Sequence, residues 1–235
     1  MKIKLFADGA EIADMIACYN EGIVTGFTTN PTLMRQAGIK SYETFAKDVL
    51  REIPDAPISF EVFSDEFSEM HRQALKLHNM GENVYVKIPI TNTKYETSLP
   101  LIKSLVEEGV KVNATAIMTV YQVRDLCEVL SPDVPSVVSV FAGRIADTLR
   151  DPEPIMRMCR LELSYYMLKH SAELLWASCR EVYNIKQADD CGCQIVTVTP
   201  SLLKKLKLSG KNLEEYSLET VKMFYDDAKA AGYEL

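Results

Sequence analysis

The sequence predicts a single α/β domain folded as a closed (β/α)8 barrel, the TIM barrel architecture. Eight short segments rich in apolar and β-branched residues recur along the chain, and stretches with apolar residues at helical spacing separate them. The 235 residues, 47% of them hydrophobic, suit one domain with a sizeable core. Because parallel strands in a barrel are covered on both faces, near-continuous apolar strands fit a barrel better than an open sheet.

The strands are expected where apolar runs are short and rich in Val, Ile, Phe and Thr. In chain order these runs are residues 3–8, 24–29, 58–63, 84–89, 111–116, 136–141, 173–178 and 194–199.

Helices are expected between the strands, as the spacing of Phe45, Val49 and Leu50 illustrates. Glycine-containing breaks stand where these helices should end and the next strand should begin. A longer helix is predicted over Pro152–His170, and a further amphipathic helix over about residues 212–230, after the last strand. A helix left over once a barrel has closed covers the barrel mouth or packs on a neighbouring subunit, and both alternatives stay open. We expect residues 1–235 to form one domain that includes this helix.

Charge and composition exclude several classes of protein. The formal net charge is −7 and there is no basic run, so nucleic acid is not an expected partner. Neither an export signal nor a run of roughly 18 apolar residues is found, so we expect a cytoplasmic protein without a membrane partner. The six cysteines are scattered, and His71, His78 and His170 lack metal-ligand spacing. No metal and no other cofactor is therefore expected.

Polar residues stand at or near the carboxyl ends of seven of the eight predicted strands. In a (β/α)8 barrel the functional side chains gather at these strand ends, so the residues are candidates for one site. They are Asp8, Thr28, Thr29, Asn30, Glu61, Lys87, Asn113, Thr115, Ser139, Arg144, Ser178 and Arg180.

Lys87 is the most informative of them, because a lone ammonium between Val86 and Ile88 costs desolvation energy unless it is paired or neutralised. One interpretation is an amine that attacks a carbonyl group and forms a Schiff base, with Glu61 and Asp8 carrying protons. The alternative is a structural lysine that reaches solvent or pairs with Glu61.

Two arginines near later strands suggest an anion site. Arg144 and Arg180, with Ser178 beside the latter, would point cations and a hydroxyl at the barrel mouth, as in a phosphate clamp. Solvated charges on the rim are the alternative.

Five motifs in order along the chain resemble the transaldolase family, especially its short bacterial and archaeal members, over about residues 3 to 206. They are GFTTNPT (26–32), YVKIPIT (85–91), NATA (113–116), SVFAGRIAD (139–147) and ASCR (177–180). The resemblance implies a barrel of class I aldolase type whose Schiff-base lysine, on the fourth strand, is Lys87.

The same resemblance implies roles for the remaining candidates. Asp8 looks like the acid/base for carbon–carbon cleavage, and Glu61 and Thr115 would position a proton-shuttling water. Asn30, Asn113 and Ser139 would hold the dihydroxyacetone hydroxyls, Thr28 and Phe141 would complete the substrate site, and Arg144, Ser178 and Arg180 would grip a phosphate. The implied reaction moves a dihydroxyacetone unit from sedoheptulose 7-phosphate or fructose 6-phosphate to an aldose phosphate.

Three alternatives remain open. Relatives that cleave fructose 6-phosphate usually carry Gln and Tyr where this chain has Glu61 and Phe141, which favours transfer over cleavage. Cys179, inside the expected phosphate clamp, leaves room for a specialised phospho- or sulfo-sugar. A non-catalytic barrel that binds sugar phosphates is the alternative from another class. The resemblance also implies a homo-oligomer, with a decamer as the candidate assembly, in which Phe224 and Tyr225 of the last helix pack on a neighbour.

Overall fold

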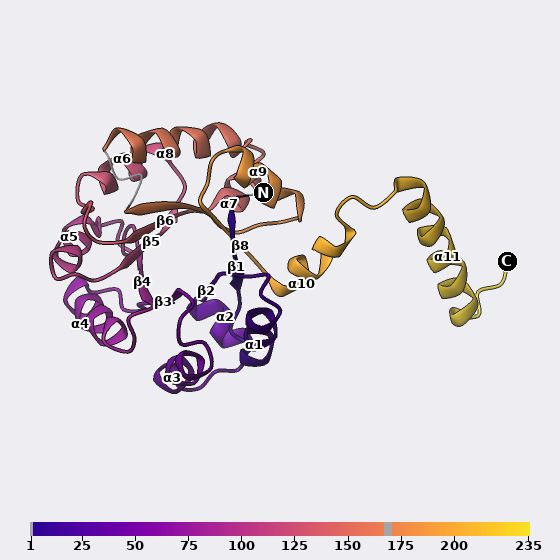
Figure 1. The fold of residues 1–235 in the computed structure, drawn as a ribbon, viewed down its shortest axis with the longest axis horizontal. Helices are drawn as coiled ribbons and strands as arrows, with labels where there is room; N and C mark the ends of the chain where they lie inside the picture. Colours follow the sequence, from indigo (N-terminus) through magenta and orange to yellow (C-terminus); the bar gives the residue numbers. More distant parts are fainter. Residues whose placement is uncertain (1, 167–170) are drawn as a thin grey trace. The chain divides into compact units, whose positions relative to one another are not determined.

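Eight parallel strands pair in chain order and close into a barrel, because β1 pairs with β8 as well as with β2 (Figure 1). The computed structural model describes residues 2–166 and 171–235. The strands are β1 (Lys4–Asp8), β2 (Gly26–Thr28), β3 (Ile58–Glu61), β4 (Val84–Pro89), β5 (Val112–Ile117), β6 (Ser136–Val140), β7 (Ala172–Trp176) and β8 (Ile195–Val198). Each overlaps one predicted segment, so the fold prediction is confirmed.

Helices follow the strands and surround them, as Figure 1 shows. The predicted helix over Pro152–His170 corresponds to α8, while residues 167–170, including His170, lie outside the described residues. The helices of the barrel are α1 (Ile12–Asn20), α2 (Pro31–Gln36), α3 (Tyr42–Glu52), α4 (Phe67–His78), α5 (Leu99–Glu107), α6 (Val120–Cys127), α7 (Ala142–Ala146), α8 (Glu153–Tyr165), α9 (Tyr183–Asp190) and α10 (Pro200–Leu203).

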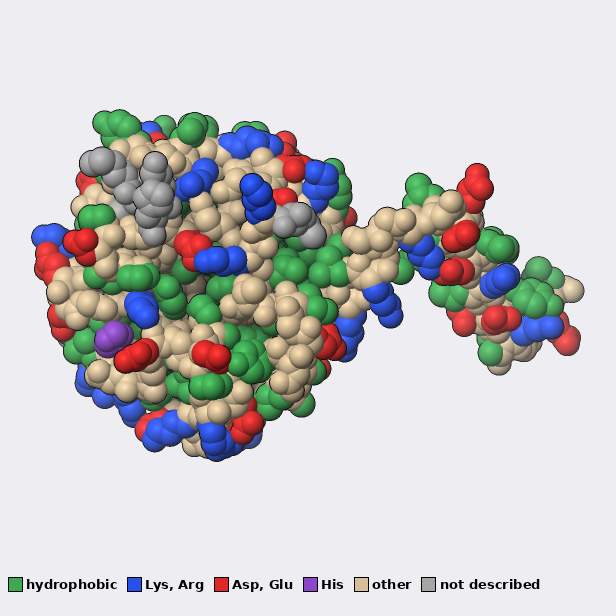
Figure 2. Space-filling view, viewed as in Figure 1, with side chains coloured by type: hydrophobic (Ala, Val, Ile, Leu, Met, Phe, Trp, Pro, Cys, Tyr) green, Lys and Arg blue, Asp and Glu red, His purple; other side chains and the backbone are tan. Residues whose placement is uncertain are grey.

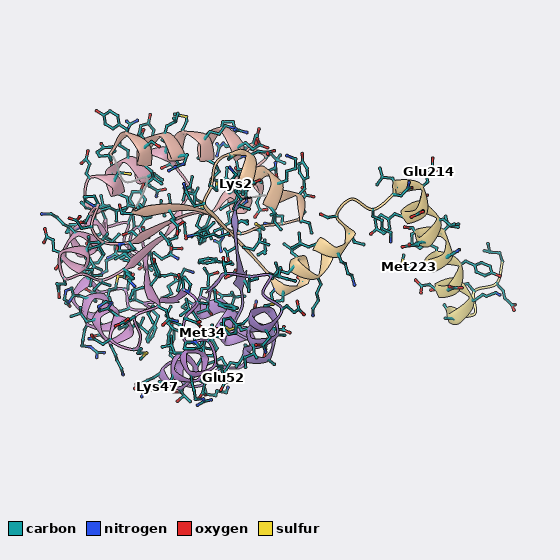
Figure 3. The ribbon with its side chains drawn as sticks, viewed as in Figure 1. Lys2, Met34, Lys47, Glu52, Glu214 and Met223 are labelled. Carbon is teal, nitrogen blue, oxygen red and sulfur yellow. The ribbon has the colours of Figure 1, made fainter. Side chains whose placement is uncertain are left out.

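Local sequence signals explain where the two helices between β2 and β3 begin. Asn30 caps α2, since its side-chain oxygen accepts a hydrogen bond from the N–H of Leu33, and Pro31 then suits the first helical position. Ser41 caps α3 in the same way. Met34, labelled in Figure 3, is the side chain that α2 buries. These caps fix the course of the chain directly after β2, beside the barrel mouth.

Apolar side chains fill one part of the barrel interior. They form a buried cluster of Phe6, Val137, Leu175, Ala177 and Ile195, contributed by four strands and the residue that follows β7. By contrast, charged side chains of both signs are interspersed over the visible surface of the barrel in Figure 2. Exposed ion pairs of this kind contribute at most about 1 kcal/mol each, so burial of the core dominates the stability.

The C-terminal residues Lys204–Leu235 form a second compact unit, distinct from Met1–Leu203. A 3-10 turn (Lys204–Leu208) precedes α11 (Leu213–Ala231), which confirms the predicted C-terminal helix. Gly232 ends α11 with a φ of 67°, a conformation that glycine adopts without strain. That the two units make one domain stays a prediction. Along the described residues, no helix combines the length and the apolar character needed to cross a bilayer.

Candidate active site

Three polar residues form a row across β3, β4 and β5. In the strand register Glu61 pairs with Lys87, and Lys87 pairs with Asn113. Directly paired residues of neighbouring strands lie on the same face of a sheet, so all three side chains point into the barrel. The structure thus brings together three of the predicted site residues at the centre of the barrel.

The amine of Lys87 is held inside the barrel by two acceptors. Its Nζ lies 3.0 Å from Oε2 of Glu61 and donates to the carbonyl oxygen of Thr29 at 2.9 Å. The Lys87 and Glu61 side chains are only 7% and 17% exposed. The lysine therefore pairs with Glu61 instead of reaching solvent.

A hydrogen-bonded chain of uncharged side chains continues the row. The Asn113 amide donates to Ser59 Oγ at 2.9 Å, and its oxygen accepts from Ser139 Oγ at 2.6 Å. All three are buried, and their mutual hydrogen bonds fix the orientation of the amide. The sequence analysis missed Ser59, although it stands two residues before Glu61 and so shares its face of the strand.

Thr115 lies two residues beyond Asn113 on β5. Its side chain is buried, and its hydroxyl has no hydrogen-bond partner among the described residues. Buried hydroxyls nearly always find a partner, which makes this atom a place to expect a bound water or a substrate oxygen. Thr115 lies within an irregularity of β5: Ala116 has a φ of 61°, and the register with β6 shifts between Ala114 and Ile117, where Ile117 pairs with Val140.

A directed chain of hydroxyl groups ends at Asp8. Thr28 donates to Asp8 Oδ1 at 2.7 Å, and its Oγ1 lies 2.6 Å from Oγ1 of Thr197. A hydroxyl has one proton to donate, so while Thr28 donates to the Asp8 carboxylate, Thr197 must donate to Thr28. Thr197 was missed by the sequence analysis. It supplies the polar residue of β8, the one strand for which no candidate was predicted.

Burial raises the pKa of Asp8 above its ordinary value. The positive charge of Lys87 and the hydrogen bond from Thr28 act in the opposite direction but are smaller effects. A carboxyl group so placed can exchange a proton more readily near neutral pH than a solvated aspartate. Burial likewise raises the pKa of the nearby Cys179 to about 12, so this residue is a thiol at neutral pH and not a nucleophilic thiolate.

The residues predicted to bind phosphate lie between β6 and α9. A Cβ atom on Gly143 would come 1.6 Å from the carbonyl oxygen of Ser178, so only glycine allows this close approach. Ser178 itself has a φ of 63°, which is unusual for a residue with a side chain. Arg144 is exposed and lies over the ring of Phe141, 5.4 Å from its centroid. Phe141 in turn packs against the apolar cluster of the barrel.

Two predicted residues are engaged in contacts of their own. Arg180 donates from Nε and Nη2 to the two carboxylate oxygens of Asp147, at 3.0 and 2.5 Å. The side-chain oxygen of Asn30 caps α2 by accepting a hydrogen bond from the N–H of Leu33. Among the described residues, no group of three His, Cys, Asp or Glu side chains is arranged to hold a metal ion.

Comparison with known proteins identifies relatives along most of the chain. A family model described as transaldolase/fructose-6-phosphate aldolase matches residues 5–235. A probable transaldolase of Thermoplasma acidophilum is 34% identical over 206 residues, which is 87% of each chain. A probable transaldolase 2 of Listeria monocytogenes is 32% identical over 217 residues, covering 91% of this chain and 94% of the relative.

Solved structures share the fold at low sequence identity. One described as a native KDPGal structure has a TM-score of 0.55 and 12% identity, covering 99% of this chain and 97% of its own. A flavocytochrome b2 variant with bound sulfite has a TM-score of 0.60 and 13% identity, and the match covers 90% of this chain and 60% of the flavocytochrome chain. At this identity the likeness extends to the barrel fold alone.

Proposed function

The chain belongs to the transaldolase/fructose-6-phosphate aldolase family, and from that premise we propose that it is a transaldolase acting through a Schiff base on Lys87. It would transfer a dihydroxyacetone unit from a ketose phosphate, sedoheptulose 7-phosphate or fructose 6-phosphate, to an aldose phosphate. The observation that carries the proposal is the Lys87 amine, buried in the barrel within 3.0 Å of a carboxylate. An amine in a dry, shaped site next to a proton acceptor is what attack on a ketone carbonyl requires.

The first half of the reaction forms the Schiff base. Glu61 accepts a proton from the Lys87 ammonium, and the free amine attacks the ketone carbon to give a carbinolamine. Loss of water from the carbinolamine needs a proton on the departing oxygen, and a water held between Glu61 and the unpartnered hydroxyl of Thr115 can deliver it. Asn113 and Ser139, already fixed by their mutual hydrogen bond, would bind the hydroxyls of the donor.

The second half breaks and remakes a carbon–carbon bond. Asp8 takes the proton of the donor's C4 hydroxyl, the C3–C4 bond breaks, and its electron pair moves into the enamine on Lys87 while the aldose phosphate leaves. The acceptor aldehyde then enters, the enamine attacks its carbonyl carbon, and Asp8 returns the proton to the new hydroxyl. Arg144, Ser178 and Arg180 would hold the phosphate of donor and acceptor alike.

Transfer is favoured over cleavage by the residue at position 141. Cleavage requires a proton on the enamine carbon before an acceptor arrives, and the phenylalanine ring has no proton to give. Phe141 is packed between the apolar cluster and Arg144, so it also limits the access of water. Product formation from fructose 6-phosphate with and without an aldose phosphate decides the point, since a lyase forms product equally well without the acceptor.

The assembly and location belong to the same proposal. We propose a homo-oligomer in the cytoplasm, with a decamer as the candidate assembly and α11 contributing to subunit contacts. Along this helix no side chain is buried within the chain itself, and Val221, Phe224 and Tyr225 are at least 60% exposed. Light scattering coupled to size exclusion tests the assembly, and a monomer would contradict it.

Borohydride trapping is the direct test of the proposed chemistry. The protein is incubated with fructose 6-phosphate, reduced, and examined by intact mass and peptide mapping beside the Lys87→Ala variant. A dihydroxyacetone-sized adduct on the Lys87 peptide is expected in the wild type and not in the variant. If none of several ketose phosphates gives an adduct, the chain is a binding protein or acts on another donor.

A further inference from the structure

The hydroxyl of Tyr42 forms hydrogen bonds with both main-chain groups of Glu61. It accepts from the N–H of Glu61 at 2.7 Å and donates to its carbonyl oxygen at 2.7 Å. Tyr42 is the first residue of α3, whereas Glu61 ends β3. A phenol hydroxyl has one proton and two lone pairs, so it can act as donor and acceptor at the same time. A main-chain N–H can only donate, and a carbonyl can only accept.

The Tyr42 hydroxyl replaces a hydrogen bond that the strand ladder would otherwise make. β2 and β3 pair with Thr28 opposite Ser59, and the N–H of Thr29 donates to the Ser59 carbonyl at 3.2 Å. In a parallel ladder of this register, the N–H of Glu61 would donate next to the carbonyl of Thr29. It donates to Tyr42 instead.

The carbonyl of Thr29 is thereby left for the catalytic amine. It accepts a hydrogen bond from Lys87 Nζ at 2.9 Å in a buried position. We propose that Tyr42 is a positioning residue: it ends the β2–β3 ladder one bond early, so that Thr29 holds the Lys87 amine while the Glu61 main chain stays fixed. This inference rests on the proposed Schiff-base function of Lys87.

The surroundings of Tyr42 suit this role. Its ring makes an edge contact with Phe60 and a tilted contact with Phe63, at centroid distances of 6.4 and 5.4 Å. These two phenylalanines flank Glu61 in the sequence, so their rings hold the Tyr42 ring beside Glu61. Burial raises the pKa of Tyr42, which keeps the phenol protonated and able to donate to the Glu61 carbonyl. Because both hydrogen bonds are made to Glu61, the hydroxyl acts on the site through Glu61 and not by contact with the substrate.

Loss of the hydroxyl has a defined consequence. In Tyr42→Phe the ring remains, but the N–H of Glu61 loses its acceptor in a partly buried position, which is costly. The acceptor that the continued ladder would offer to this N–H is the Thr29 carbonyl. Taking it removes an acceptor from Lys87 and shifts the Glu61 carboxylate relative to the amine, and small displacements of this kind slow reactions strongly.

The experiment compares adduct formation in the wild type, Tyr42→Phe and Tyr19→Phe. Tyr19 also donates to an acceptor, Asp55, but on the exposed surface, so its variant is a matched control for loss of a phenol. The rate of borohydride-trapped adduct is measured against fructose 6-phosphate concentration. For Tyr42→Phe we expect the saturating rate to fall at least about tenfold while the half-saturating concentration stays within about twofold. Tyr19→Phe should match the wild type in both.

The outcomes separate this inference from the proposed function. If Tyr42→Phe forms the adduct at the wild-type rate, or only the half-saturating concentration rises, the positioning role is overturned while Lys87 chemistry stands. If the wild type forms no adduct with either fructose 6-phosphate or sedoheptulose 7-phosphate, the proposed function is overturned and this inference with it. Should Tyr42→Phe fail to fold, 3-fluorotyrosine at position 42 keeps the hydroxyl but weakens it as an acceptor. An intermediate rate with that residue supports the proposal, and a wild-type rate contradicts it.

Discussion

Nζ of Lys87 and Oε2 of Glu61 lie 3.0 Å apart in a layer of the barrel where both side chains are largely removed from solvent. Burying two charges costs more desolvation energy than an apolar pair of the same volume, even when the charges attract each other. The pair is thus a poor way to stabilise a barrel. Its presence among apolar strands is better explained by the chemistry that an amine and a carboxylate perform together.

The first prediction concerns this pair. Lys87→Met removes the amine, so trapping should disappear, and it leaves the Glu61 carboxylate unpaired, which should lower the free energy of unfolding by about 3 kcal/mol. In the double variant Lys87→Met/Glu61→Gln the unpaired charge is gone, and stability should return to the wild-type value or exceed it. Urea unfolding of the two single variants and the double variant measures the coupling. Additive losses would contradict the account of the pair.

The second prediction concerns Asp8. Because its pKa is raised in the folded protein, the folded state binds a proton there more tightly than the unfolded chain does. The associated stability is present at pH below the ordinary value of 3.8 and is lost as the pH rises through the folded value. The Asp8→Asn variant has no carboxyl group to ionise at this position. Its free energy of unfolding should therefore increase relative to that of the wild type as the pH is raised to 8.

Activity should change in the opposite direction. Without a group that exchanges protons, Asp8→Asn should lose about 10²- to 10⁴-fold in the rate of carbon–carbon cleavage. Schiff-base trapping should persist because Lys87 is untouched, but the adduct should have the mass of the intact ketose phosphate because the C3–C4 bond is not broken. A stability difference that does not move in favour of the Asn variant as the pH rises to 8, or an Asn variant that turns over normally, would refute this assignment.

Residues that share a strand face could be predicted from the sequence, whereas contacts between distant segments could not. Lys87, Glu61 and Asn113 could be grouped because strand ends meet at one mouth, whatever the loops between them. Thr197 was missed because a threonine inside QIVTVT looks like an ordinary β-branched strand residue. Tyr42 lies on a helix, and its hydrogen bonds to Glu61 depend on where β2 stops pairing with β3, which no local pattern encodes.

The third prediction concerns Thr197. Thr197→Val keeps the shape of the side chain but removes the proton that is donated to Thr28, so Thr28 becomes a weaker donor to Asp8. The carboxylate is then less well stabilised, and the limb of the pH–rate profile that reports deprotonation of Asp8 should move to higher pH. Thr197→Ser keeps the hydroxyl and should follow the wild type. Equal profiles for the Val and Ser variants would show that the hydroxyl chain does not act on Asp8.

The last prediction concerns the arginines at the barrel mouth. The pair between Arg180 and Asp147 is half exposed, so breaking it should leave the free energy of unfolding nearly unchanged. The ion pair would instead orient the Arg180 guanidinium, because Asp147 binds Nε and Nη2 and leaves the other N–H groups for a phosphate.

Arg144→Gln and Arg180→Gln should each raise KM for a sugar phosphate about tenfold or more, the loss expected for one charge-assisted hydrogen bond. KM for an unphosphorylated ketose should stay unchanged, because that substrate never reaches the arginines. Arg180→Lys should behave like Arg180→Gln, since a single ammonium cannot pair with Asp147 through two parallel hydrogen bonds and bind phosphate as well. Arg51→Gln is the matched control, because Arg51 is likewise exposed and paired with carboxylates, those of Asp48 and Glu52 on α3. If KM rose equally for phosphorylated and unphosphorylated substrates, the arginines would support the mouth of the barrel without recognising phosphate.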